Sequence, residues 1–231
     1  MDCRDYLRRI PLSTAIASHE FVRSYIFVDN SNIFIEGQKA AAKAENSEVA
    51  GKLYRVDFGR LFAFLRPRGN ECFFSLGGED FPKLYGSEPP PLDSLWKILG
   101  KMGVSLKIFR KNPRGLEKRV DAALIWDYSR LILELQKTPD GELVIVAGDA
   151  DYYDLIERGK ERRWKVRIVC WRHATAQIVQ RLPQFEDLTP HLKQVGFFER
   201  YKFDHEFGDW GGKIDWSKVV PYGDKSHRKM T

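Results

Sequence analysis

Short hydrophobic runs alternate with longer amphipathic segments along most of this chain. The segment at 57–65 carries Phe58, Leu61, Phe62 and Leu65 on one helical face, spaced three and four residues apart. Strands that alternate with helices indicate βαβ units, a mostly parallel sheet and helices on both of its faces. The predicted fold is therefore α/β with three layers. The predicted strands are 25–28, 72–76, 104–109, 143–147 and 166–171, and the predicted helices are 33–44, 57–65, 92–102, 121–136 and 152–163.

The remaining segments are polar or rich in Gly and Pro, and they are predicted to be connections. We expect one globular domain over residues 24–195, preceded by an arm at 1–23 and followed by an aromatic and basic tail at 196–231. Within the domain, the predicted connections are a polar link at 45–52, a surface loop at 77–91, a basic loop at 111–118 and a helix or loop at 173–188.

Composition narrows the class of protein. The 231 residues are 43% hydrophobic and carry a formal net charge of +6, a mild basic bias that favours polyanionic partners. The cysteines Cys3, Cys72 and Cys170 are odd in number and lack CxxC spacing, which argues against disulfides and zinc. No apolar run approaches the length of a membrane span. We therefore expect an intracellular protein that does not enter a membrane.

Four aspartates stand where ligand sites form in parallel sheets. Asp29 follows the first predicted strand, Asp149 and Asp151 follow the fourth, and Asp121 opens the helix before the fourth. If strands one and four are neighbours, these carboxylates converge in one cleft at the carboxyl ends of the strands. Such a cluster calls for a hard divalent cation, Mg²⁺ or Mn²⁺, which can activate water for attack on a phosphodiester.

Each aspartate also has a structural explanation. Asp29 and Asp151 are suited to capping helices, Asp149 to a turn, and Asp121 to the positive end of a helix dipole. The joint placement of all four at one edge of the sheet favours the metal site over these separate roles. Asp127 lies six residues beyond Asp121, off its helical face, and is predicted to be on the surface.

Three blocks of sequence resemble the NYN domain family of the PIN-like nuclease superfamily. The blocks are YIFVDNSNIFIEG, EKRVDAALIWD and LVIVAGDADYYDLIERGKERRWKVRIV, in that order. The resemblance implies a five-stranded parallel sheet of order 3-2-1-4-5 and a ribonuclease dependent on Mg²⁺ or Mn²⁺. It also implies that Asp29, Asp121, Asp149 and Asp151 hold metal, that Asn32 positions a carboxylate or phosphate, and that Lys118 steadies the substrate. Ala150 and Tyr152 depart from residues common in the family, without removing a ligand.

Basic residues next to the acidic cluster are candidates for substrate binding, with a merely solvated basic surface as the alternative. The predicted contacts to RNA are Lys111, Arg114, Lys118, Arg119 and Arg172, with Asn32. A second basic group, at 158–167, is predicted to be a solvated helix end, and His173 a hydrogen-bonded structural residue. In the tail, Trp210, Trp216 and Tyr222 are candidates for stacking on bases, for packing on the domain, or for holding a second subunit as a homodimer.

Three classes of function are candidates for a chain with these residues. The first is a metal-dependent ribonuclease, probed by Asp29→Asn or Asp149→Asn. The alternative is a non-catalytic RNA-binding or scaffold module with the same fold, whose RNA binding would survive chelation. A small-molecule phosphohydrolase or nucleotide-binding domain is disfavoured, because the turn after the first strand has no glycine motif and no P-loop is present.

Overall fold

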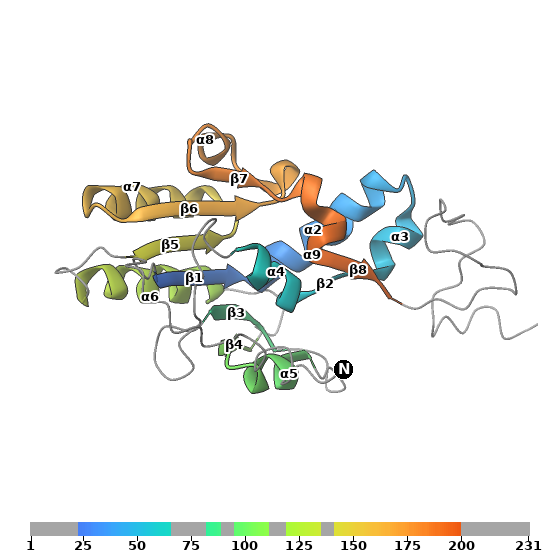
Figure 1. The fold of residues 1–231 in the computed structure, drawn as a ribbon, viewed down its shortest axis with the longest axis horizontal. Coiled ribbons are helices and arrows are strands. Elements are labelled where there is room, and N and C mark those ends of the chain that lie inside the picture. The colour runs from blue at the N-terminus through green and yellow to red at the C-terminus, as the bar shows by residue number, and fades with distance from the viewer. Residues whose placement is uncertain (1–22, 66–81, 89–94, 111–118, 135–140, 200–231) are drawn as a thin grey trace, which may run out of the picture.

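The computed structural model describes residues 23–65, 82–88, 95–110, 119–134 and 141–199, and they form an α/β fold around one main sheet (Figure 1). The predicted strand at 72–76, the basic loop at 111–118 and the tail residues Trp210, Trp216 and Tyr222 lie outside these residues, as does the predicted arm up to residue 22. The main elements of the sheet are β1 (Arg23–Asp29), β3 (Lys83–Ser87), β4 (Ser105–Phe109), β5 (Gly141–Val146), β6 (Lys165–Cys170) and β7 (Phe185–Asp187).

The main sheet has the strand order β4-β3-β1-β5-β6-β7, and each neighbouring pair is parallel. The predicted α/β class with a central parallel sheet is confirmed. The observed order keeps the predicted centre, where the first strand lies beside the strand at 141–146. It differs from the prediction by the additional edge strand β7, in a segment expected to be a helix or loop.

The strand next to β1 is β3, in a segment predicted to be a loop. The Gly and Pro residues of 77–91 favour a loop. In the structure, however, Leu84, Tyr85 and Gly86 are buried in a strand that lies between β1 and β4. A β-carbon on Gly86 would lie 2.9 Å from the Trp96 side chain, so this glycine lets a helix approach the strand closely. The Gly therefore serves packing within a strand, and the loop prediction is wrong for residues 83–87.

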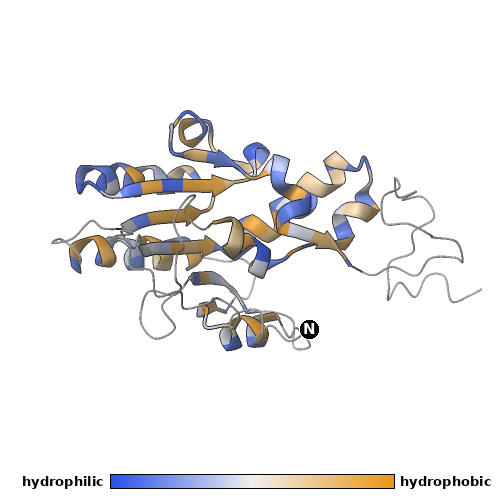
Figure 2. Ribbon diagram, in the orientation of Figure 1, coloured by the Kyte–Doolittle hydropathy of each residue, from blue (hydrophilic) through white to orange (hydrophobic). Residues whose placement is uncertain are grey.

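Helices cover both faces of the sheet, as predicted. One face packs against α2 (Asn30–Ala44), α4 (Phe58–Phe64), α5 (Leu95–Lys101) and α9 (Leu192–Val195). The other packs against α6 (Val120–Glu134), α7 (Tyr153–Glu161) and α8 (Gln177–Gln180). Hydrophobic residues dominate β5 and β6, which are buried on both faces (Figure 2). None of the described helices is long and apolar enough to cross a lipid bilayer.

A small second sheet extends the fold beyond the main one. Strands β2 (Tyr54–Val56) and β8 (Gly196–Phe198) pair antiparallel, so β8 lies just past the predicted end of the domain at residue 195. The predicted polar link at 45–52 is wrong, because α3 (Glu48–Leu53) occupies most of it. Ser47 caps this helix by accepting a hydrogen bond from the Ala50 N–H at 3.2 Å.

Asp127 is buried, at 7% exposure, which contradicts its predicted place on the surface. It lies three residues after the buried Leu124, so it shares the sheet-facing side of α6. Its Oδ2 accepts a hydrogen bond from the Tyr85 hydroxyl at 2.8 Å, and Lys83 Nζ lies 3.8 Å away. The prediction was wrong because it took Asp121 as the reference for the sheet-facing side of α6. The buried residues Leu124, Tyr128 and Ile132 define that side, and Asp127 lies among them.

Candidate functional site

Asp29 stands at the junction of β1 and α2. It is the last residue of the strand and the N-cap of the helix, and its Oδ1 accepts a hydrogen bond from the Asn32 N–H at 3.1 Å. The side chain is 7% exposed. A carboxylate this buried needs compensation, and the positive end of the α2 dipole supplies part of it.

Alternation along β1 determines the face to which Asp29 belongs. Tyr25 and Phe27 pack in the core beneath α6 and α7, while Ile26 and Val28 pack on the opposite face. Because successive side chains of a strand point to opposite faces, Asp29 continues the series that faces α6 and α7. It therefore lies on the side of the sheet where α6 carries Asp121.

The loop after β5 lies beside Asp29. Val28 pairs with Val146, so the end of β5 is level with the end of β1, and Gly148 and Asp149 follow at this edge. Asp149 caps the short 3-10 turn at Ala150–Tyr152 and accepts a hydrogen bond from the Asp151 N–H at 3.1 Å. Both Asp149 and Asp151 are exposed to solvent.

The hydroxyl of Tyr152 contacts one of the aspartates and is close enough to two others for their charges to act on it. It donates a hydrogen bond to Asp121 Oδ1 at 2.7 Å, and the ring is 1% exposed. Burial raises the pKa of this hydroxyl above its usual value, and the negative charges of Asp29, Asp121 and Asp149 raise it further. The three carboxylates thus act on one point in space, although they come from three separate segments.

The donor set suits a hard divalent cation, because it consists of carboxylate oxygens. In the part of the chain that the structure describes, no three Asp, Glu, His or Cys side chains form a ready-made metal-binding group. The carboxylates near Tyr152 are therefore suitable ligands for such a cation by their chemical type. They would not complete its coordination alone, so water or other oxygen atoms would have to supply the remaining ligands.

The predicted substrate residues fall into two groups. Lys111, Arg114 and Lys118 lie outside the described residues. The guanidinium of Arg119, two residues before Asp121, lies 5.6 Å from the centre of the Phe109 ring. Arg172 is engaged elsewhere: its Nε lies 2.7 Å from Asp187 Oδ2, and its guanidinium lies over the ring of Phe185. Arg172 would have to leave this ion pair to bind a phosphate.

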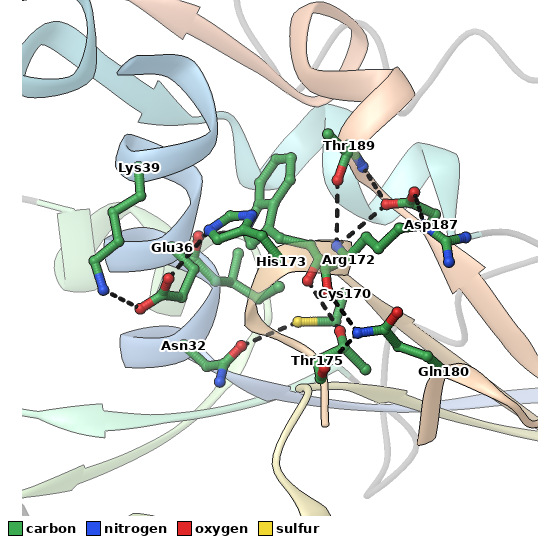
Figure 3. A network of polar contacts seen from close by, with 12 residues as sticks. Asn32, Glu36, Lys39, Cys170, Arg172, His173, Thr175, Gln180, Asp187 and Thr189 are labelled. Atoms are coloured by element: carbon green, nitrogen blue, oxygen red, sulfur yellow. Dashed lines mark hydrogen bonds and ion pairs between the residues drawn. The ribbon is translucent and has the colours of Figure 1, made fainter. Parts of the chain in front are cut away.

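A second polar group joins the first turns of α2 to the end of β6 and the residues that follow it (Figure 3). His173 Nε2 lies 3.2 Å from Glu36 Oε2, as expected for a hydrogen-bonded His173, and the Cys170 thiol donates to Asn32 Oδ1 at 3.1 Å. Burial raises the pKa of Cys170 to about 12, while hydrogen bonds with Thr175 and the Trp171 backbone lower it and the Asp29 and Glu36 carboxylates raise it slightly. Asn32 thus accepts a hydrogen bond here. No sequence motif pointed to Glu36, because its partner is 137 residues away.

Two hydrogen bonds to backbone carbonyls connect this second polar group to the segments that carry Asp29 and Asp149. The Trp171 indole donates to the Ile33 carbonyl at 2.9 Å, which ties α2 to the end of β6. The Ala176 N–H donates to the Gly148 carbonyl at 2.8 Å, which ties the following loop to the residue before Asp149. The carboxyl ends of β1, β5 and β6 therefore form one connected rim.

In an α/β sheet of this kind, ligand sites form at the carboxyl ends of the central strands, where Asp29 and Asp149 lie. The chain belongs to the NYN domain family, whose model matches residues 23–189, more than half of the sequence. This family is one of PIN-like nucleases, so the family membership supports a nuclease type of function. The chain is also similar to a crystal structure of a protein of unknown function from Vibrio parahaemolyticus. That likeness has 15% identity and a TM-score of 0.49, over 75% of this chain and 96% of the other. No curated protein matches the chain.

Proposed function

We propose that this NYN domain protein is a ribonuclease that requires Mg²⁺ or Mn²⁺ and hydrolyses phosphodiester bonds of RNA. The observation that supports it best is geometric: Asp29 and Asp149 follow the paired strands β1 and β5, and Asp121 accepts a hydrogen bond from Tyr152 in the 3-10 turn that Asp149 caps. Carboxylates that converge in this way repel one another, and a divalent cation relieves the repulsion. In this proposal the three residues hold the cation, directly or through water, and Asp151 completes the acidic rim.

The bound cation would lower the pKa of a water molecule and offset the charge that develops on the phosphate. The protein's own groups fix the acidic side chains for this purpose. The Asn32 N–H holds one oxygen of Asp29, and the Tyr152 hydroxyl holds one oxygen of Asp121. Groups held by such outer contacts need little reorganisation when substrate binds.

The substrate is proposed to be RNA on the strength of the family and of the net charge of +6. Arg119, which is exposed beside Asp121, is the described residue best placed among the predicted contacts to reach a phosphate. Lys111, Arg114 and Lys118 remain predicted contacts, as does Asn32 through its amide.

The test is cleavage of varied RNAs by the purified protein with Mg²⁺, Mn²⁺ or a chelator. Asp29→Asn and Asp149→Asn should abolish the metal-dependent cleavage while leaving the fold intact, because Asn caps a helix about as well as Asp. Asp154→Asn is the matched control, since Asp154 is an exposed carboxylate in the first turn of α7. Wild-type protein that cleaves none of the RNAs with either metal would overturn the proposal, as would unimpaired aspartate variants.

A non-catalytic RNA-binding module is the second candidate. The observation in its favour is that the described residues contain no ready-made group of three metal ligands. In that case RNA binding persists in chelator and in both aspartate variants, and no RNA is cleaved. Binding measurements beside the cleavage assay therefore separate the two functions.

A further inference from the structure

A polar stripe runs along α2 away from Asp29. Asp29, Asn32, Glu36, Lys39 and Lys43 follow one another at intervals of three and four residues, so they occupy one side of the helix. The stripe changes character along its length, from acidic and amide groups at the start of the helix to lysines in its last turns. Any chain that leaves the acidic rim along this side of α2 meets the lysines next.

The lysines border a surface groove of about 540 Å³ between α2 and α3. Its lining includes Lys39 and Lys43 from α2 and Lys52 from α3. The two helices are held close together at its base, because a β-carbon on Gly51 would lie 2.8 Å from that of Ala42. The groove is thus a fixed feature of the fold, with walls from two packed helices.

The charge of the groove suits an anionic chain. Its lining contains three lysines and one carboxylate, Glu48. Lys39 pairs with Glu36 at 2.7 Å, whereas no ion pair of Lys43 or Lys52 occurs among the described residues. Ile35, 49% exposed, adds an apolar surface to the same lining. Lysines along an open groove suit a phosphate backbone, because each phosphate they neutralise releases counterions.

We propose that the α2–α3 groove binds the phosphate backbone of single-stranded RNA on one side of the cleaved bond. This inference rests on the proposed ribonuclease function and adds a route for the substrate. At about 1.5 Å per helical residue, Lys43 lies roughly 21 Å from Asp29 along α2. Only an RNA that extends several nucleotides from the acidic rim reaches the groove, so length becomes a determinant of affinity.

The test measures binding without metal, so that it does not depend on cleavage. Fluorescence anisotropy with a labelled single-stranded RNA, in chelator, gives Kd as a function of salt for the full-length protein. Each phosphate contact on a single strand contributes about 0.7 to the slope of log Kd against log salt, so Lys43→Gln with Lys52→Gln should lower the slope by about 1.4. Between about 50 and 200 mM salt, the wild-type Kd should then rise about sevenfold more than that of the variant.

The matched control is Lys97→Gln with Lys101→Gln, which removes the same charge from exposed positions on α5. The control should keep the wild-type slope, and an RNA too short to reach the groove should bind all three proteins alike. An unchanged slope in the groove variant, an equal loss in the control, or no RNA binding by the wild type would overturn the inference. RNA cleavage with an unchanged slope would overturn the groove alone, while a lowered slope without cleavage would overturn only the nuclease.

Discussion

Replacing Tyr152 by Phe removes one hydroxyl group and keeps the buried ring. The hydroxyl donates to Asp121 Oδ1 at 2.7 Å, and the residue is 1% exposed. A hydrogen bond to a charged group contributes about 1.5–3 kcal/mol to stability. We expect Tyr152→Phe to lower the free energy of unfolding by this amount. Because the hydroxyl also holds Asp121 in place, we expect cleavage to fall about 10- to 100-fold, the usual loss when an outer partner of a metal ligand is removed.

Urea denaturation of four proteins measures the interaction directly: wild type, Tyr152→Phe, Asp121→Ala and the double variant. Residues in one hydrogen-bonded pair show coupling energies of about 0.5–3 kcal/mol, and we expect about 1 kcal/mol or more here. Tyr153→Phe serves as the control, since this neighbouring ring is only partly buried and makes no hydrogen bond to an aspartate within the described residues. Losses that add within about 0.3 kcal/mol would refute the reasoning that Tyr152 positions Asp121.

Three further changes probe the surroundings of the site. Tyr85→Phe takes the 2.8 Å donor from the buried Asp127, and we expect urea denaturation to show a loss of about 1.5–3 kcal/mol. Gly148→Ala would put a methyl group 2.8 Å from the Ala174 carbonyl oxygen, so the same assay should show a loss of about 1–3 kcal/mol; wild-type stability would contradict this close packing. The raised pKa of Cys170, from 9.0 to about 12, makes the folded state favour the thiol, so its contribution is complete below pH 9.0 and is lost as pH rises towards 12. Urea denaturation at successive alkaline pH values should show this loss, and Cys170→Ala should reduce it.

The core of the fold could be read from the sequence because its strands are continuous apolar runs. Parallel strands buried on both faces need hydrophobic residues at every position, and 143–147 has this pattern in its clearest form. The same pattern places Asp29 and Asp149 at strand ends, which depends only on where each run stops. Position along the chain was therefore sufficient for this part of the site.

Features that depend on contacts between distant segments could not be read in this way. The strand β3 has a short sequence, KLYGS, whose glycine and polar ends are typical of loops, and only its neighbours on both sides make it a strand. The hydrogen-bond partner of the buried Asp127 is Tyr85 of that strand, 42 residues away along the chain. The pairing of Glu36 with His173 likewise exists only because α2 packs on the end of β6.

Capping and metal binding are two consequences of the same placement of Asp29, and they can be separated experimentally. A cap requires a side-chain oxygen at the start of α2, where the Asn32 N–H reaches it, whereas a metal ligand requires negative charge at that point. Asp29→Asn keeps the oxygen and removes the charge, while Asp29→Ala removes both. We expect the Asn variant to unfold at close to the wild-type urea concentration, and the Ala variant to be about 1 kcal/mol less stable. If metal-dependent cleavage is lost equally in both, the charge is what matters for function; if cleavage instead follows stability, Asp29 acts only as a cap.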